Sequence, residues 1–165
     1  MSLKTREILD KIKAELDSIT PSIGRVHASL RASASPEDLI TDYLFKDSTG
    51  GKVIKAFVIR SGQQRIERMT TGKNGFSMRN RTVIIDGFVT IQHKNPVGAE
   101  GILEDAFDLV IGKLQALQRL DLESQGDTFH PGRMELTQIG VAKVSNHNVV
   151  AAQLMTVIQD RFLGA

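Results

Sequence analysis

Apolar residues near the start of the chain recur at helical spacing. Steps of one, three, four and three residues place them on one face of a helix over residues 3–19: Ile8, Leu9, Ile12, Leu16 and Ile19. A stronger helix is predicted over residues 97–120, where steps of four, three, four and three link Leu103, Phe107, Val110, Leu114 and Leu117. Further apolar residues widen this second stripe, so we expect the second helix to pack across a broad sheet face.

Alternation of apolar and polar residues predicts strands in the second half of the chain. The clearest strand covers residues 81–94, whose one face carries Val83, Ile85, Val89 and Ile91. Gly87 within it indicates a bulge or a close approach by another backbone. Residues 134–144 and 149–162 also alternate, and the four polar residues between them predict a closing hairpin.

A further hairpin is predicted in the first half of the chain. Residues 52–60 are rich in β-branched and aromatic side chains, as strands are. Ser61-Gly62 then predicts a turn into a mostly polar strand over residues 63–69, which is expected to be exposed or at a sheet edge.

The remaining segments are predicted as short elements and loops. Residues 22–31 are interpreted as an edge strand or loop. A short helix is expected to begin at Ser35-Pro36, a capping residue followed by proline, and to end near Phe45. Residues 70–80 and 125–133 are predicted to be loops, the first of them long and flexible.

Together these elements predict an α+β fold. The expected order is a helix, a short helix, three antiparallel strands, a long helix and a final hairpin. This order favours a mainly antiparallel β-sheet with helices packed on one face, in two layers. A chain of 165 residues fits one domain with one core, so we predict a single domain over residues 1–165.

Composition narrows the possible chemistry. The chain has no cysteine, which excludes disulfides, a thiol nucleophile and a thiolate metal site. With 21 basic and 19 acidic residues, the net charge of +2 gives little general attraction to nucleic acid. No stretch approaches the roughly 18 apolar residues of a membrane span, and the first residues mix charge with apolar positions, so we expect a soluble protein without a signal peptide.

The segment MTTGKNGFSMRNR, residues 69–81, invites comparison with a phosphate-binding loop. In that motif a first glycine stands five positions before the glycine of Gly-Lys, and a serine or threonine follows the lysine. Around Gly72-Lys73 these positions hold Glu67 and Asn74 instead. The predicted context, between two strands, also differs from the strand-to-helix context of the motif, so nucleotide hydrolysis is not expected.

Other catalytic patterns are absent from the sequence. The four histidines, His27, His93, His130 and His147, show no metal-ligand spacing, and no G-x-S-x-G is present. Glu104 and Asp108 stand one helical turn apart, but we interpret them as the solvated face of the long helix. The sequence therefore predicts no catalytic residue, no metal and no cofactor.

Basic residues concentrate between residues 60 and 81. They could contact a phosphate backbone, but only one aromatic residue lies among them and no recognition helix is predicted, so a protein interface is the preferred interpretation. The candidate interface residues are Arg60, Arg65, Arg68, Lys73, Phe76, Arg79 and Arg81.

Three stretches together resemble the tail terminator, or tail completion, proteins of bacteriophages and related tail-like particles. They are GRVHASLR near the start, RTVIIDGFVTIQHKNPVGAEGILEDAFDLVIGKL in the centre and IGVAKVSNHNVVAAQLMTVIQDRFL at the end. Their order and spacing fit that family across most of the chain.

The resemblance implies a structural protein of the virion. Such a protein forms a ring, commonly a hexamer, on the finished tail tube, stops tube growth and presents a surface to the neck or head. The implied partners are further copies of the chain, the tail tube protein and neck or head-tail connector proteins, with the sheath protein as a further candidate. DNA would meet the ring only by passing through its lumen.

The resemblance also implies a location and a role for loop 70–80. The protein would lie at the tail-neck junction of the virion, and in the host cytoplasm during assembly. We expect loop 70–80 to contact a neighbouring subunit or the tube and to become ordered on binding. The open alternatives are a head-tail connector or neck ring protein, a basic-patch nucleic-acid-binding protein, and an enzyme with an unrecognised site.

Overall fold

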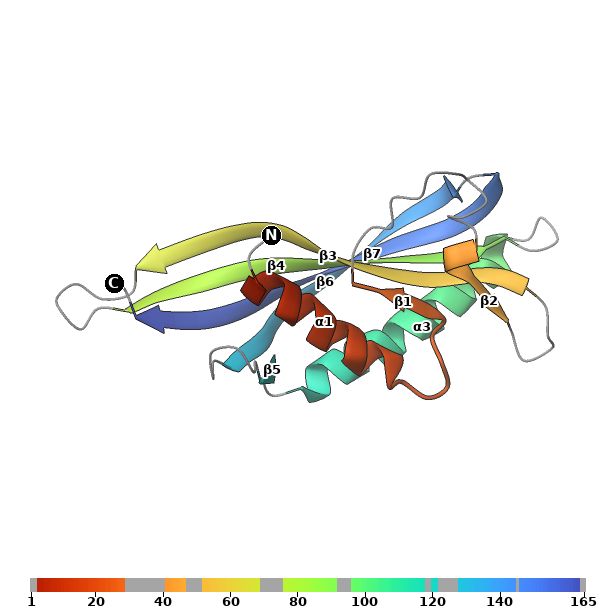
Figure 1. Cartoon of the computed structure of the whole chain (residues 1–165). Coiled ribbons are helices and arrows are strands. Elements are labelled where there is room, and N and C mark those ends of the chain that lie inside the picture. Colours follow the sequence, from red (N-terminus) through yellow and green to blue (C-terminus); the bar gives the residue numbers. More distant parts are fainter. Residues whose placement is uncertain are drawn as a thin grey trace.

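A long twisted sheet forms the frame of the molecule (Figure 1). The computed structural model describes residues 3–28, 41–46, 52–68, 76–91, 96–117, 120–121, 128–144 and 146–163. In these residues seven strands form one mixed sheet in the order β1-β3-β4-β7-β6-β5, with β2 pairing a second segment of β3. The strands are β1 (Arg25–His27), β2 (Leu44–Lys46), β3 (Lys52–Arg68), β4 (Phe76–Thr90), β5 (Leu120–Asp121), β6 (Thr128–Val144) and β7 (His147–Leu163).

Two helices cover one face of this sheet, as the sequence predicts. Helix α1 (Leu3–Asp17) lies over β1 and β3, and helix α3 (Pro96–Ala116) lies over β4 and β7 (Figure 1). We call this side of the sheet the helix face and the opposite side the open face. The predicted α+β class, with a single domain and a mainly antiparallel sheet, is confirmed, since among the described strands only β1 and β3 pair in parallel.

The main core lies between the helices and the helix face. The predicted stripes are buried at Ile8, Leu9, Ile12, Leu16, Leu103, Phe107, Val110 and Leu114. Phe107 packs edge to face against Phe57 of β3, with 5.2 Å between ring centroids. A Cβ atom on Gly87 would lie 2.6 Å from the Phe107 ring, so β4 accommodates that ring only because position 87 has no side chain. The close approach predicted at Gly87 is therefore made by aromatic rings and not by another backbone.

A smaller core covers part of the open face. Tyr43, at the end of a helical turn over residues 41–43, packs with residues of β3 and β7. This second cluster comprises Tyr43, Ile54, Ala56, Val58 and Val149. The central part of the sheet is thus buried on both faces.

The prediction of a hairpin at Ser61-Gly62 is wrong. β3 continues through these residues to Arg68, with a bulge between Ser61 and Gln64. Serine and glycine suit a bulge as well as a turn, and a Cβ atom on Gly62 would lie within 3.2 Å of the Thr82 side chain. The two predicted strands are consequently one strand of 17 residues.

Strands also replace parts of two predicted loops. β4 begins at Phe76, so residues 76–80 of the predicted flexible loop are paired with β7, and residues 77–80 also with β3. Residues 69–75 lie outside the described part of the chain. β6 begins at Thr128, inside the predicted loop 125–133. Long-range pairing with β7 explains both differences, because the sequence pattern of these polar segments contains no information about a distant partner strand.

Other boundaries agree more closely. The final hairpin is confirmed, but β6 and β7 approach each other to Val144 and His147, leaving a shorter connection than predicted. Residues 25–27 form the predicted edge strand. The long helix ends at Ala116 and not near Leu120, which belongs to β5. The predicted short helix ends at Tyr43, because Leu44–Lys46 pairs with β3.

Candidate assembly interface

The basic residues selected from the sequence do not form one patch. Arg60 and Arg65 pair with Ile84 and Asn80 of β4, which occupy positions on the open face. Arg81 pairs with Gln64 and Ile158 and lies on the helix face. Alternation along a strand therefore divides this cluster between two sides of the sheet.

The bulge in β3 determines which side Arg65 occupies. Arg60 and Arg65 are an odd number of residues apart, so a regular strand would place them on opposite faces. The extra residue between Ser61 and Gln64 restores Arg65 to the open face. The bulge thereby puts both cations on the face that carries no long helix.

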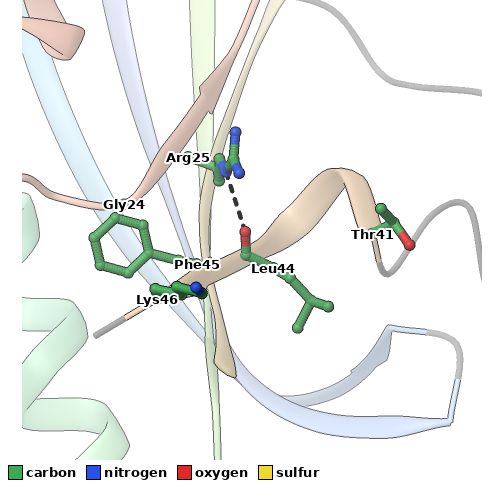
Figure 2. A pocket seen from close by; sticks show the side chains of 6 residues that line it. All are labelled: Gly24, Arg25, Thr41, Leu44, Phe45 and Lys46. Carbon is green, nitrogen blue, oxygen red and sulfur yellow. Dashed lines mark hydrogen bonds between the residues drawn. The ribbon is translucent and has the colours of Figure 1, made fainter. Parts of the chain in front are cut away.

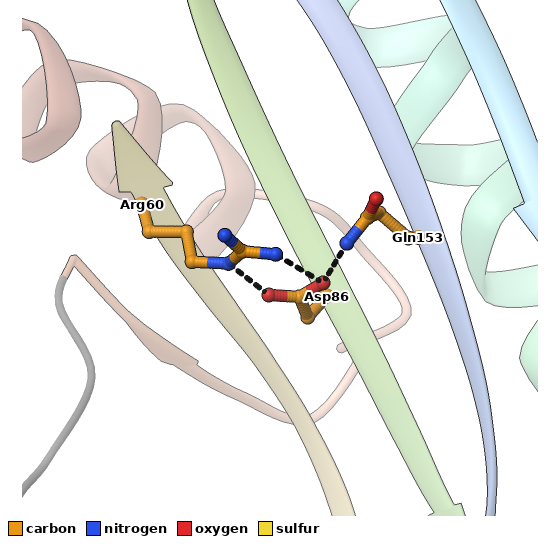
Figure 3. A network of polar contacts seen from close by, with 3 residues as sticks. All are labelled: Arg60, Asp86 and Gln153. Atoms are coloured by element: carbon orange, nitrogen blue, oxygen red, sulfur yellow. Dashed lines mark hydrogen bonds and ion pairs between the residues drawn. The ribbon is translucent and has the colours of Figure 1, made fainter. Parts of the chain in front are cut away.

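Arg60 is part of a polar network across the three central strands (Figure 3). Its Nε–H donates to Oδ2 of Asp86 on β4 at 2.6 Å, and Nη2 lies 3.4 Å from Oδ1. Gln153 of β7 donates from Nε2 to Oδ1 of Asp86 at 2.7 Å. Asp86 is buried, with 8% of its surface exposed, whereas the Arg60 side chain is 36% exposed.

This network links the three central strands on the open face, next to the residues that the Tyr43 cluster buries. Asp86 accepts hydrogen bonds from both neighbouring strands, and the guanidinium compensates its charge. Removing either donor would leave a buried carboxylate short of partners. Arg60 therefore stabilises the sheet through Asp86, and only part of its side chain is accessible to another protein.

Arg81 is not on the surface, contrary to the prediction. It retains 2% exposure, and its Nη1 donates to Oγ1 of Thr5 in α1 at 2.7 Å. Thr5 and Ile158, which lie next to Arg81, are distant from it in sequence. Because Arg81 adjoins a polar segment, the sequence alone suggested that it is exposed. In this structure Arg81 links α1 to β4 and does not take part in an external surface.

The other candidates lie on or next to an extension of the sheet that we call the arm. The arm comprises residues 64–68 of β3, 76–80 of β4 and 159–163 of β7, which extend beyond α1 (Figure 1). Arg65 is exposed there, and Arg79 is half-buried. Arg68 ends β3 and Phe76 begins β4, whereas Lys73 lies outside the described residues.

A pocket of about 550 Å³ opens between β1 and β2 (Figure 2). It is lined by Gly24, Arg25, Thr41, Leu44, Phe45 and Lys46. Nε–H of Arg25 donates to the carbonyl oxygen of Leu44 at 3.1 Å, so this cation is used to hold β1 near β2. These six described residues include no carboxylate or imidazole that could act as a general base.

His27, Glu104 and Asp108 make structural or solvent contacts. His27 Nε2 lies 2.9 Å from the carbonyl oxygen of Asp42, and its ring packs against Tyr43. Glu104 and Asp108 are exposed, as expected for the solvated side of α3. Among the residues that the structure describes, no three histidine, aspartate or glutamate side chains lie close enough together to hold a metal ion.

One lysine on β3 has a shifted pKa. Burial lowers the pKa of Lys55 below 10.5, and the nearby carboxylate of Asp105 on α3 partly opposes this shift. Lys55 pairs with Val89 on the helix face, beside the main core. The shift follows from packing beside the main core.

The chain matches no protein-family model and no curated protein. In the described part of the chain, no helix is both long enough and apolar enough to cross a membrane.

Proposed function

We propose that the protein is a tail terminator that forms a ring, commonly a hexamer in the family that it resembles, on the completed tail tube. The ring would stop tube growth and provide the attachment surface for the neck or head. Its partners would be further copies of itself, the tube protein and neck or connector proteins. It would act at the tail-neck junction.

One observation carries this proposal: the three stretches with the resemblance are neighbours in the fold. The central stretch forms part of β4 and most of α3, and the closing stretch forms the last part of β6 and all of β7. β4 pairs with β7 along fifteen residues, and α3 packs over both. The first stretch contributes β1, which pairs with β3 next to β4. A resemblance shared by such contiguous elements supports a common fold more strongly than separate motifs do.

The form of the sheet also supports a role in assembly. The arm extends three paired strands beyond α1, and it exposes polar side chains such as Gln64, Arg65 and Gln159. A long paired extension offers neighbours a large surface that remains ordered by its own backbone hydrogen bonds. Assembly proteins need such surfaces.

The distribution of cations favours a protein partner over nucleic acid. Arg60 is bound to Asp86, Arg81 is buried against Thr5, and Arg65 lies on the opposite face from Arg81. A continuous track of cations along a phosphate backbone would require these groups on one exposed surface.

Deleting the gene tests the proposal. Without a terminator, tubes continue to grow, so electron microscopy should show tails of irregular and excess length without heads. A head-tail connector or neck ring would give a different result, namely tails of normal length that fail to join heads. Immunogold labelling of intact particles provides the matched observation, since a terminator is found at the tube end and a connector at the capsid vertex.

A further inference from the structure

The sheet has two long edges along which no described strand pairs. On one side, β1 and β2 pair with the first part of β3, and residues 64–68 extend beyond both. On the other side, β5 pairs only with Thr128 and Phe129 of β6, so residues 134–144 form the outer edge. Unpaired strand edges present rows of N–H and C=O groups that can pair with another chain. We call these segments the β3 edge and the β6 edge.

Both edges expose apolar side chains on the helix face. Ile66 on the β3 edge is 57% exposed, and Leu136 and Val141 on the β6 edge are 41% and 62% exposed. Leu136 and Val141 pair with Leu154 and Val150, which belong to the main core, and this pairing sets their face. Ile66 pairs with Arg79, two positions from Arg81 and therefore on the same face. Joining the two edges would bring these apolar groups together and remove them from water.

Charged groups on the open face are complementary at the two edges. Arg65 on the β3 edge pairs with Asn80, and Glu135 on the β6 edge pairs with Met155, positions that alternation assigns to the open face. Both side chains are exposed. A joined sheet would therefore place an arginine and a glutamate on one face and aliphatic groups on the other.

The strand directions make such a joint antiparallel. β3 and β7 are each antiparallel to β4, so they run the same way, while β6 runs opposite to β7 and hence opposite to β3. Two copies placed side by side with the same face outward thus bring β3 and β6 together as antiparallel neighbours, the slightly more stable pairing. Because the two edges are different surfaces, the contact is heterologous and can continue from copy to copy until a ring closes.

We infer that the β3 edge of one copy pairs with the β6 edge of the next copy, so that one sheet continues around the assembly. This inference rests on the proposed ring and specifies its subunit contact. Pairing of two β6 edges would also bury Leu136 and Val141, but it would end in a dimer because both partners would use the same surface.

Cysteine cross-linking tests the contact directly, since the natural chain contains no cysteine. Ile66→Cys is mixed with Leu136→Cys or Val141→Cys and oxidised, either in rings recovered from tails or at high protein concentration. At least one mixture should give a heterodimer on a non-reducing gel. Thr137→Cys is the matched control, because Thr137 is exposed on the same edge but pairs with Gln153, on the open face.

Each result of the cross-linking decides the matter. Cross-links in the mixture alone support the inference, whereas a dimer formed by Leu136→Cys or Val141→Cys without its partner indicates pairing of like edges and overturns it. Rings that form without any of these cross-links also overturn it, yet leave the proposed function intact. Conversely, the cross-link together with labelling away from the tube end would reject the proposed function and retain the contact.

A second pair of variants measures the contribution of the β6 edge. Leu136→Lys with Val141→Lys should weaken self-association at least tenfold by analytical ultracentrifugation, because lysines on a strand edge oppose pairing. Ile102→Lys with Leu109→Lys is the matched control, since these residues are also exposed aliphatic groups but lie on α3. Unchanged association of the β6 variant, with normal circular dichroism, would contradict the inference.

Discussion

The three central strands pass through two different environments. Between the helices and the Tyr43 cluster they are buried on both faces, with Phe57, Val58 and Ile85 fully buried. In the arm, beyond the bulge in β3, the same strands remain paired, but Gln64, Arg65 and Ile66 are exposed. We refer to the helix-covered part as the body. Backbone pairing is therefore common to body and arm, and burial is what distinguishes them.

This difference separates stability from recognition. The hydrophobic effect follows the apolar area removed from water, so most of the folding free energy must arise in the body. Substitutions in the arm remove little buried area and should be tolerated. A surface with this property can change its partner without endangering the fold.

The largest expected effect comes from the centre of the body. Phe107→Ala removes a fully buried ring that packs on Phe57 and above Gly87, and should lower the free energy of unfolding by about 3–5 kcal/mol. Ile66→Ala in the arm should change it by less than about 0.5 kcal/mol. Urea unfolding followed by circular dichroism measures both, and equal losses would remove the distinction between body and arm.

Gly87→Ala tests the same packing by adding one carbon. The new Cβ would lie 2.6 Å from the Phe107 ring and 2.9 Å from the Phe57 ring, so we expect a loss of about 1–3 kcal/mol. Gly112→Ala on α3 is the control, because nothing lies within 4 Å of its added carbon. The control should stabilise the protein by up to about 1 kcal/mol through helix propensity. A neutral Gly87→Ala would mean that the rings can move away.

Within the body, Asp86→Ala should cost about 1–3 kcal/mol. It leaves the Gln153 amide and the Arg60 guanidinium without their shared acceptor. Arg60→Met should cost less, because Arg60 is more exposed and Gln153 still donates to Asp86. The double variant measures the coupling, and strictly additive losses in urea unfolding would show that the network does not act as a unit.

The smallest predicted effect depends on pH. Burial lowers the pKa of Lys55 below 10.5, so between the lowered pKa and 10.5 the unfolded chain binds more protons than the folded chain. Stability relative to Lys55→Met should therefore rise with pH across this window. Thermal unfolding from pH 7 to 10.5 measures it, and a constant difference would contradict it. In Asp105→Asn the window should begin at lower pH, because the carboxylate that raises the Lys55 pKa is removed.

The body was largely predictable from the sequence, whereas the arm was not. Periodicity identified both helices because their buried residues repeat along one face, and alternation identified the helix face of β4 for the same reason. In the arm, polar residues on both faces leave no such pattern, so residues 76–80 were assigned to a loop. Only pairing with β3 and β7 makes them a strand.

The candidate site was predictable only in part. Arg65 was correctly placed in an exposed strand. The burial of Arg81 depends on Thr5 and Ile158, which are distant in sequence. Asp86 and Gln153 were not identified as partners of Arg60, although an acid within an otherwise apolar strand is a signal of a buried polar contact.

The bulge between Ser61 and Gln64 has a consequence for how such a chain can diverge. Deleting one residue there would remove the bulge, and every following β3 side chain would keep its face, because Ser61 and Gln64 would then stand two positions apart like their partners Val83 and Arg81. A change of one residue in a regular part of β3 would instead turn every following side chain to the opposite face and exchange the side chains that the arm offers on each side. The faces on which the arm presents its side chains therefore depend on the number of residues in β3 as well as on their identity.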